Sequence, residues 1–141
     1  MMNTPSGRKR ILLIDSQDLW RAPAAQALEA AGFCVSQANE FDLNSESGAA
    51  ERAPDVVILG CASVGCQERN WIQAVVAKGW PLQVLSASLP WEVMRSVFVA
   101  GASDVTERPY DPAQVVAIVS QTLMVLADRD EYSLVHRRRN W

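Results

Sequence analysis

The sequence alternates short apolar runs with longer segments of helical pattern, and this alternation constrains the fold most strongly. The runs lie at 10–15, 33–37, 55–59 and 82–85, and a short fifth strand is expected at 104–106. The helical segments lie at 18–31, 41–52, 67–78, 90–100 and 111–127. A continuous apolar run is typical of a strand that is covered on both faces. The order predicts an α/β fold of three layers, α/β/α, with a doubly wound five-stranded parallel sheet.

Glycine and proline residues mark the ends of the expected helices. Gly32, Gly79 and Gly101 follow three of them, where a glycine commonly ends a helix. Asp111 is expected to cap the last helix, which can continue past residue 127 into the tail. Pro23 lies too far inside the first helix for a favourable first turn, so we expect a kink or a shifted start there. The weakest helical pattern is at 41–52.

Length and composition are those of one domain with one core. The chain has 141 residues, of which 49% are hydrophobic. No apolar run approaches the ~18 residues of a membrane span, and the basic N-terminus lacks the apolar region of a signal peptide. We therefore expect a cytoplasmic protein with a flexible N-terminal tail (1–9), a domain (10–127) and a C-terminal helical extension or linker (128–141).

Cysteine and charge patterns exclude some classes of site. Cys34, Cys61 and Cys66 lack the spacing of a metal site, so free thiols are expected, with a redox role as the alternative. Residues 11–128 hold 6 basic and 14 acidic residues, a net charge of −8, whereas both ends are basic. The acidic body is a poor nucleic-acid binder. The basic ends are solvated, begin a linker, or contact nucleic acid or a membrane.

Functional residues of a parallel sheet lie at the carboxyl ends of its strands. In this chain those positions hold Asp15 and Ser16 after the first strand and Gly60 after the third. Ser86 ends the fourth strand, and Arg108 follows the fifth.

The same places carry a resemblance to a known family. The segments Leu13–Asp15, Pro54–Leu59 and Leu85–Ala87, and above all AGASDVTERPY at 100–110, resemble the CheY-like receiver domain of bacterial response regulators. The resemblance covers about 10–127. It implies a flavodoxin/CheY-like (βα)5 fold with strand order 2-1-3-4-5.

The resemblance also implies a phosphorylation site, from which this chain departs. A working receiver has two acids after strand 1, an acceptor Asp at the end of strand 3, a Ser or Thr after strand 4 and a Lys after strand 5. Asp15 and Ser86 match, but Ser16, Gly60 and Arg108 replace the second acid, the acceptor and the lysine. Because glycine has no side chain to phosphorylate, we predict a degenerate pseudo-receiver without aspartyl phosphorylation, without enzymatic activity and without a cofactor or metal.

Two interpretations of the remnant pocket stay open. Asp15 can pair with Arg108, since a buried acid needs a compensating charge. Alternatively, Asp15 helps hold a cation, with Asp18 as the only nearby acid that could assist. A small ligand bound by Asp15, Ser86 and Arg108 would make the domain ligand-regulated.

The resemblance further implies an interaction face. In receivers, the fourth helix, fifth strand and fifth helix commonly bind a partner or a second copy, and an aromatic residue on strand 5 acts as a switch. Here Val105 stands at the switch position, while Trp91 and Tyr110 border the face. Trp91 is a contact anchor or packs over the helix end.

The function expected from these observations is that of a phosphorylation-independent receiver domain. It would act as a protein-interaction or dimerisation module in bacterial signal transduction (two-component signalling and phosphorelays) or transcription control, with any effector domain outside this chain. The alternative is the ligand- or cation-regulated receiver. A flavodoxin-like FMN protein is disfavoured, since 16–20 is not a phosphate loop and Asp18 would repel phosphate. An RNA-binding antiterminator would need a helical RNA-binding region that this chain lacks.

Overall fold

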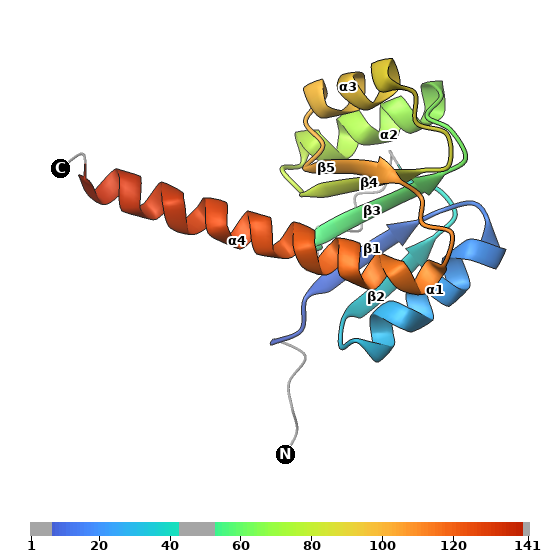
Figure 1. The fold of residues 1–141 in the computed structure, drawn as a ribbon, viewed down its shortest axis with the longest axis horizontal. Helices are drawn as coiled ribbons and strands as arrows, with labels where there is room; N and C mark the ends of the chain where they lie inside the picture. The colour runs from blue at the N-terminus through green and yellow to red at the C-terminus, as the bar shows by residue number, and fades with distance from the viewer. Residues whose placement is uncertain (1–6, 43–52, 140–141) are drawn as a thin grey trace.

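A parallel sheet forms the centre of the molecule in the computed structural model, which describes residues 7–42 and 53–139, with side chains up to Arg129. Its strands are β1 (Arg10–Ile14), β2 (Cys34–Ala38), β3 (Val56–Cys61), β4 (Leu82–Ser86) and β5 (Asp104–Glu107). The order is β2-β1-β3-β4-β5 (Figure 1), which confirms the predicted sheet and topology.

Strand register brings the carboxyl ends together at one edge of the sheet. Ile14 on β1 is paired with Leu59 on β3, Gly60 with Leu85 on β4, and Ser86 with Glu107 on β5. Residues that follow these strands therefore share one edge. Asp55 lies at the opposite edge, where its carboxylate accepts a hydrogen bond from the Arg10 amide at 2.7 Å.

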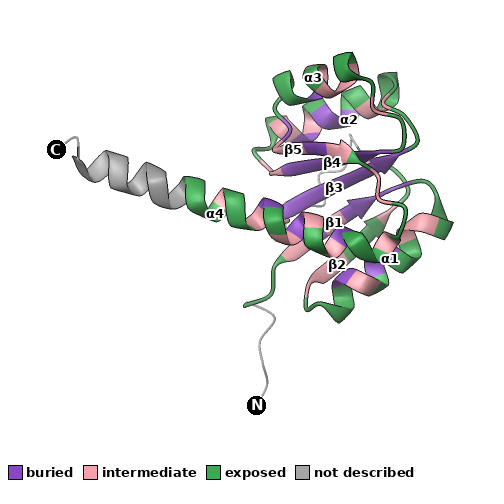
Figure 2. Cartoon of the chain, in the orientation of Figure 1, coloured by how far each residue is buried: buried purple, intermediate pink, exposed green. Residues whose placement is uncertain are grey.

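Helices cover both faces of the sheet. They are α1 (Asp18–Ala30), α2 (Cys66–Ala77), α3 (Trp91–Val99) and α4 (Val115–Arg139), with a 3-10 turn η3 (Pro112–Gln114) before α4. The buried core forms two clusters. One contains residues of α1 and α4, and the other contains residues of α2 and α3. Figure 2 shows that the central strands β3 and β4 are buried between partly exposed helices, whereas the edge strands β2 and β5 are only partly buried.

Several expected boundaries were close, and some were wrong. β3 extends beyond the expected end at residue 59 and includes Gly60 and Cys61, because its pairing with β4 continues to Ser86. α1 starts at Asp18 and continues through Pro23, so the expected shift of its start does not occur. The expected helix at 41–52 lies almost wholly outside the described residues.

Glycine is required after α3. Gly101 has a φ of +114°, and a Cβ there would lie 2.7 Å from Cγ1 of Val76. The position therefore combines left-handed backbone with contact against α2.

The last helix is longer than the sheet needs. α4 has 25 residues, which corresponds to about 37 Å at ~1.5 Å per residue. It runs without a break across residues 127 and 128, and its second half extends beyond the sheet (Figure 1). Within the described ranges, no helix has the length and apolar character needed to cross a bilayer.

Candidate functional site

A buried ion pair occupies the carboxyl edge of the sheet. Asp15 follows β1 and is only 1% exposed, and its Oδ2 pairs with the guanidinium of Arg108, which follows β5. Its other oxygen accepts a hydrogen bond from the Gln17 amide at 2.9 Å. This pairing confirms one of the two interpretations that the sequence left open for Asp15.

Gly60 is enclosed by the same pair. A Cβ built on Gly60 would clash with Oδ2 of Asp15 and would lie 3.2 Å from its Cγ and 3.5 Å from a terminal nitrogen of Arg108. The space in which a side chain at position 60 would begin is therefore filled by the carboxylate. The ion pair can lie in this position because residue 60 has no side chain.

Two residues that the sequence analysis did not single out complete the setting of Arg108. Gln17 accepts a hydrogen bond from the Arg108 guanidinium through its side-chain oxygen. The guanidinium carbon lies 4.8 Å from the centre of the Trp20 ring, a cation–π geometry. The Trp20 indole then donates to the Pro109 carbonyl at 3.3 Å. These contacts join Gln17 and Trp20, at the start of α1, to residues that follow β5. Sequence spacing alone does not predict contacts between segments so far apart in the chain.

The remaining predicted pocket residues are engaged locally or face solvent. Ser86 is buried, and its hydroxyl donates to the Ser88 carbonyl at 2.6 Å. Ser16 is exposed. Asp18 pairs with Arg21 on the same helix instead of pointing toward Asp15.

Cys61 is a buried thiol at the end of β3. Burial raises the pKa of the Cys61 thiol to about 11, although a hydrogen bond with Ser86 and the charge of Arg108 act in the opposite direction. The thiol is therefore neutral near pH 7 and a weak nucleophile. Neither nucleophilic nor metal-binding chemistry is favoured at this position.

The donor set does not fit a divalent cation. Mg²⁺ needs several oxygen ligands in an octahedral array, but the carboxylate of Asp15 is already bound by a guanidinium and a backbone amide. Gly60 and Ser16 supply no carboxylate. Over the described part of the chain, no group of three or more His, Cys, Asp or Glu residues could hold a metal ion.

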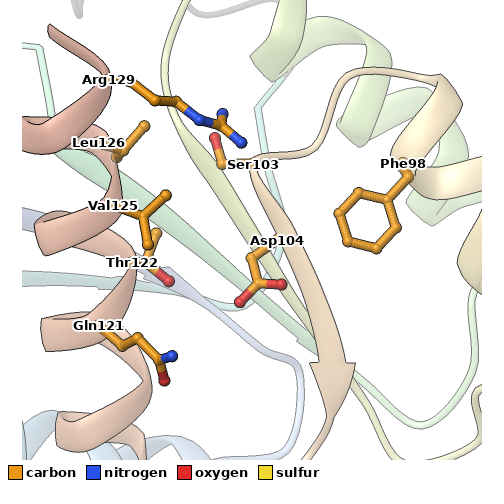
Figure 3. Close-up of a pocket in the computed structure, with 8 residues that line it drawn as sticks. All are labelled: Phe98, Ser103, Asp104, Gln121, Thr122, Val125, Leu126 and Arg129. Atoms are coloured by element: carbon orange, nitrogen blue, oxygen red, sulfur yellow. The ribbon is translucent and has the colours of Figure 1, made fainter. Parts of the chain in front are cut away.

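A second candidate site is a groove of about 300 Å³ between α3, β5 and α4 (Figure 3). Its walls combine apolar residues with one acid and one base. The lining residues are Phe98, Ser103, Asp104, Gln121, Thr122, Val125, Leu126 and Arg129.

A buried polar network lies beneath this groove. Gln83 on β4 is fully buried, and its side-chain oxygen accepts a hydrogen bond from the Thr122 hydroxyl at 2.7 Å. Its amide nitrogen donates to the Thr106 hydroxyl at 3.3 Å. Three elements (β4, β5 and α4) are thus joined by satisfied polar groups, which positions α4 on the sheet.

The three residues predicted for the interaction face are in different environments. Trp91 is 69% exposed and Tyr110 is fully exposed, so both side chains are accessible to solvent. Val105 is 4% exposed and belongs to the core with α2 and α3. Because this side chain is buried, it offers no surface for direct contact with a partner.

Comparisons with known proteins identify the fold. No protein-family model matches the chain, and no curated protein sequence matches it. Solved structures do match, and several of them are response regulators or their receiver domains. A CheY-like receiver domain of Methanospirillum hungatei has a TM-score of 0.70 at 16% identity, over 87% of this chain and 99% of that one.

An orphan response regulator of H. pylori has a TM-score of 0.68 at 22% identity, over 83% of this chain and 98% of that one. A response regulator of Burkholderia pseudomallei, solved with a phosphorylated aspartic acid, a calcium ion and citrate, has a TM-score of 0.66 at 17% identity. That match covers 89% of this chain and 74% of the other. The chain thus has the CheY-like receiver fold.

Proposed function

We propose that this chain is a receiver-type signalling module that works without phosphorylation and without catalysis, through contacts with a protein partner. One observation carries the proposal. The space at which a side chain of residue 60 would begin is occupied by the carboxylate of Asp15, which is paired with Arg108. A site closed by the protein's own charges has no place for a phosphoryl group.

The contrast with a phosphorylated relative supports this proposal. The B. pseudomallei regulator holds a phosphorylated aspartic acid and a calcium ion. In the present chain the donor set lacks the ligands for such a cation, and Arg108 supplies the positive charge that balances Asp15. The negative charge of Asp15 is therefore balanced by a residue of the protein and not by a bound cation.

We further propose that the groove between α3, β5 and α4 is the interaction face and that a second copy of the chain binds there. Asp104 and Arg129 lie in the same groove, so a two-fold axis can place the acid of one copy opposite the base of the other. Phe98 and Val125 each expose 44% of their surface beside these charges, and Val99 is exposed more fully. Apolar side chains flanked by charged ones suit an interface with an apolar core and a polar rim.

Titration with Mg²⁺ and beryllofluoride, a phosphoryl mimic, tests the loss of phosphorylation. Trp20 stacks on Arg108, so binding at the pocket would change its fluorescence. We expect no saturable change in fluorescence or melting temperature. A saturable, Mg²⁺-dependent change that disappears in an Asp15→Asn variant would overturn the proposal and favour the alternative, a receiver regulated by a ligand or cation at Asp15, Ser86 and Arg108.

A further inference from the structure

The segment that joins β5 to α4 is attached to the beginning of the chain. Arg108 reaches Asp15 and Gln17 with its two terminal nitrogens, and its guanidinium lies over the Trp20 ring. The next residue, Pro109, accepts the indole hydrogen bond of Trp20 across a sequence separation of 89 residues. The loop between β1 and α1 and the first turn of α1 thus form a receptor for this segment.

The receptor has the chemistry of an organic-cation site. A buried carboxylate is unfavourable unless a positive charge compensates it. The Asp15 carboxylate is inaccessible to solvent, and the side chain of Arg108 is only 9% exposed. An amide oxygen from Gln17 and the face of Trp20 complete a surface that suits a flat, delocalised cation.

We propose that Arg108 is an internal ligand. Its guanidinium occupies a guanidinium-binding site formed by Asp15, Gln17 and Trp20, and this occupancy fixes the first turns of α4 against α1. The inference rests on the proposed function, because it explains how the interaction face is held in one arrangement without phosphate.

The geometry connects the site to α4 within a few residues. The Arg108 amide donates to the Ser86 carbonyl at 2.9 Å, which fixes the end of β5. Asp111 then caps η3 by accepting a hydrogen bond from the Ala113 amide at 3.0 Å. η3 packs against α1, and Val115 at the start of α4 is fully buried. Movement of Arg108 would be transmitted to α4 over this short path.

Chemical rescue of an Arg108→Ala variant tests the inference. The truncation would leave a cavity between the carboxylate, the amide and the indole, and free guanidinium can fill it. We expect the variant to melt several degrees lower than the wild type. Guanidinium chloride at millimolar concentration, well below denaturing levels, should restore part of the loss in a saturable manner.

Sodium chloride at equal ionic strength should have no such effect. The Asp15→Asn/Arg108→Ala double variant should not respond to guanidinium, because the site then lacks its charge. Amide hydrogen exchange gives a second readout that general destabilisation would not reproduce. Exchange at 108–118 should rise in the single variant and fall again with guanidinium, while exchange in α2 stays unchanged.

A guanidinium response no larger than the sodium response would overturn the inference, as would exchange that rises equally in α2 and α4. If Arg108→Ala does not fold in either salt, a cycle of Asp15→Asn, Arg108→Met and the double variant decides instead. Coupled losses of melting temperature support the site, and additive losses contradict it. Failure of the proposed function is distinguishable, since it would appear as a beryllofluoride response of the unaltered protein.

Discussion

At the carboxyl edge of the sheet, the presence or absence of single side chains determines which groups can occupy the site. Gly60 has no side chain, Asp15 occupies the volume above it, and Arg108 neutralises Asp15. The sequence showed a glycine at position 60 and the opposite charges of Asp15 and Arg108. It could not show that the carboxylate lies against Gly60, because that contact depends on the register of β1 and β3.

Replacing Gly60 with alanine should destabilise the protein by about 1–3 kcal/mol, because the added methyl group overlaps the Asp15 carboxylate within a packed site. Urea unfolding measures the change. Gly7→Ala is the control, since a Cβ at that position would have no atom within 4 Å. Equal stability of Gly60→Ala and wild type would contradict the described geometry.

Cys61 should be the last of the three cysteines to react in the folded protein. It is buried and its pKa is raised to about 11, while Cys66 is exposed. Iodoacetamide labelling followed by mass spectrometry should modify Cys66 first, and unfolding in urea should remove the difference. Early modification of Cys61 would argue against its buried position.

The raised pKa of Cys61 also has a consequence for stability. The folded state disfavours the thiolate, so the stability that this thiol contributes is complete below its ordinary pKa of 9.0 and is lost as pH rises toward about 11. Cys61→Ala should show a smaller decrease in melting temperature over that interval than the wild type. An identical decrease in both proteins would exclude this contribution.

At the level of elements, the sequence predicted order and type well and boundaries less well. The existence of five strands followed from the short segments between the helical ones, of which β1, β3 and β4 are mainly apolar, whereas the strand order was implied by the resemblance to receiver domains. The end of β3 was missed because Gly60 resembles a turn residue, although pairing with β4 holds it in the strand. The contacts of Trp20 and of the pair Gln83 and Thr122 join elements distant in sequence, so no local pattern reveals them.

α1 should become more stable when Pro23 is replaced by alanine. Pro23 is exposed within the helix and cannot donate the backbone hydrogen bond of that turn. We expect a gain of about 1–3 kcal/mol, seen as a higher urea midpoint with an unchanged slope. Gln26→Ala, also exposed on α1, is the control and should change stability little. No gain would mean that Pro23 is accommodated without cost.

For the whole molecule, the groove between α3, β5 and α4 should govern self-association. Val125→Glu places a charge in the groove, opposite an apolar surface of the second copy, and should weaken the dimer at least tenfold in sedimentation equilibrium. Ala117→Glu is the matched control, because Ala117 is exposed on α4 outside the groove. A wild-type protein that stays monomeric at high concentration would exclude the homodimer.

Because α4 is long, a small rotation at its first turns moves its far end over a large distance. Its first turns lie beside Arg108, whereas its far end extends beyond the sheet (Figure 1). For a rigid rod of about 37 Å, a rotation of about 10° at the base displaces the tip by about 6 Å. Sub-ångström adjustments around one buried arginine would thus be amplified into a displacement large enough to separate two contacting surfaces.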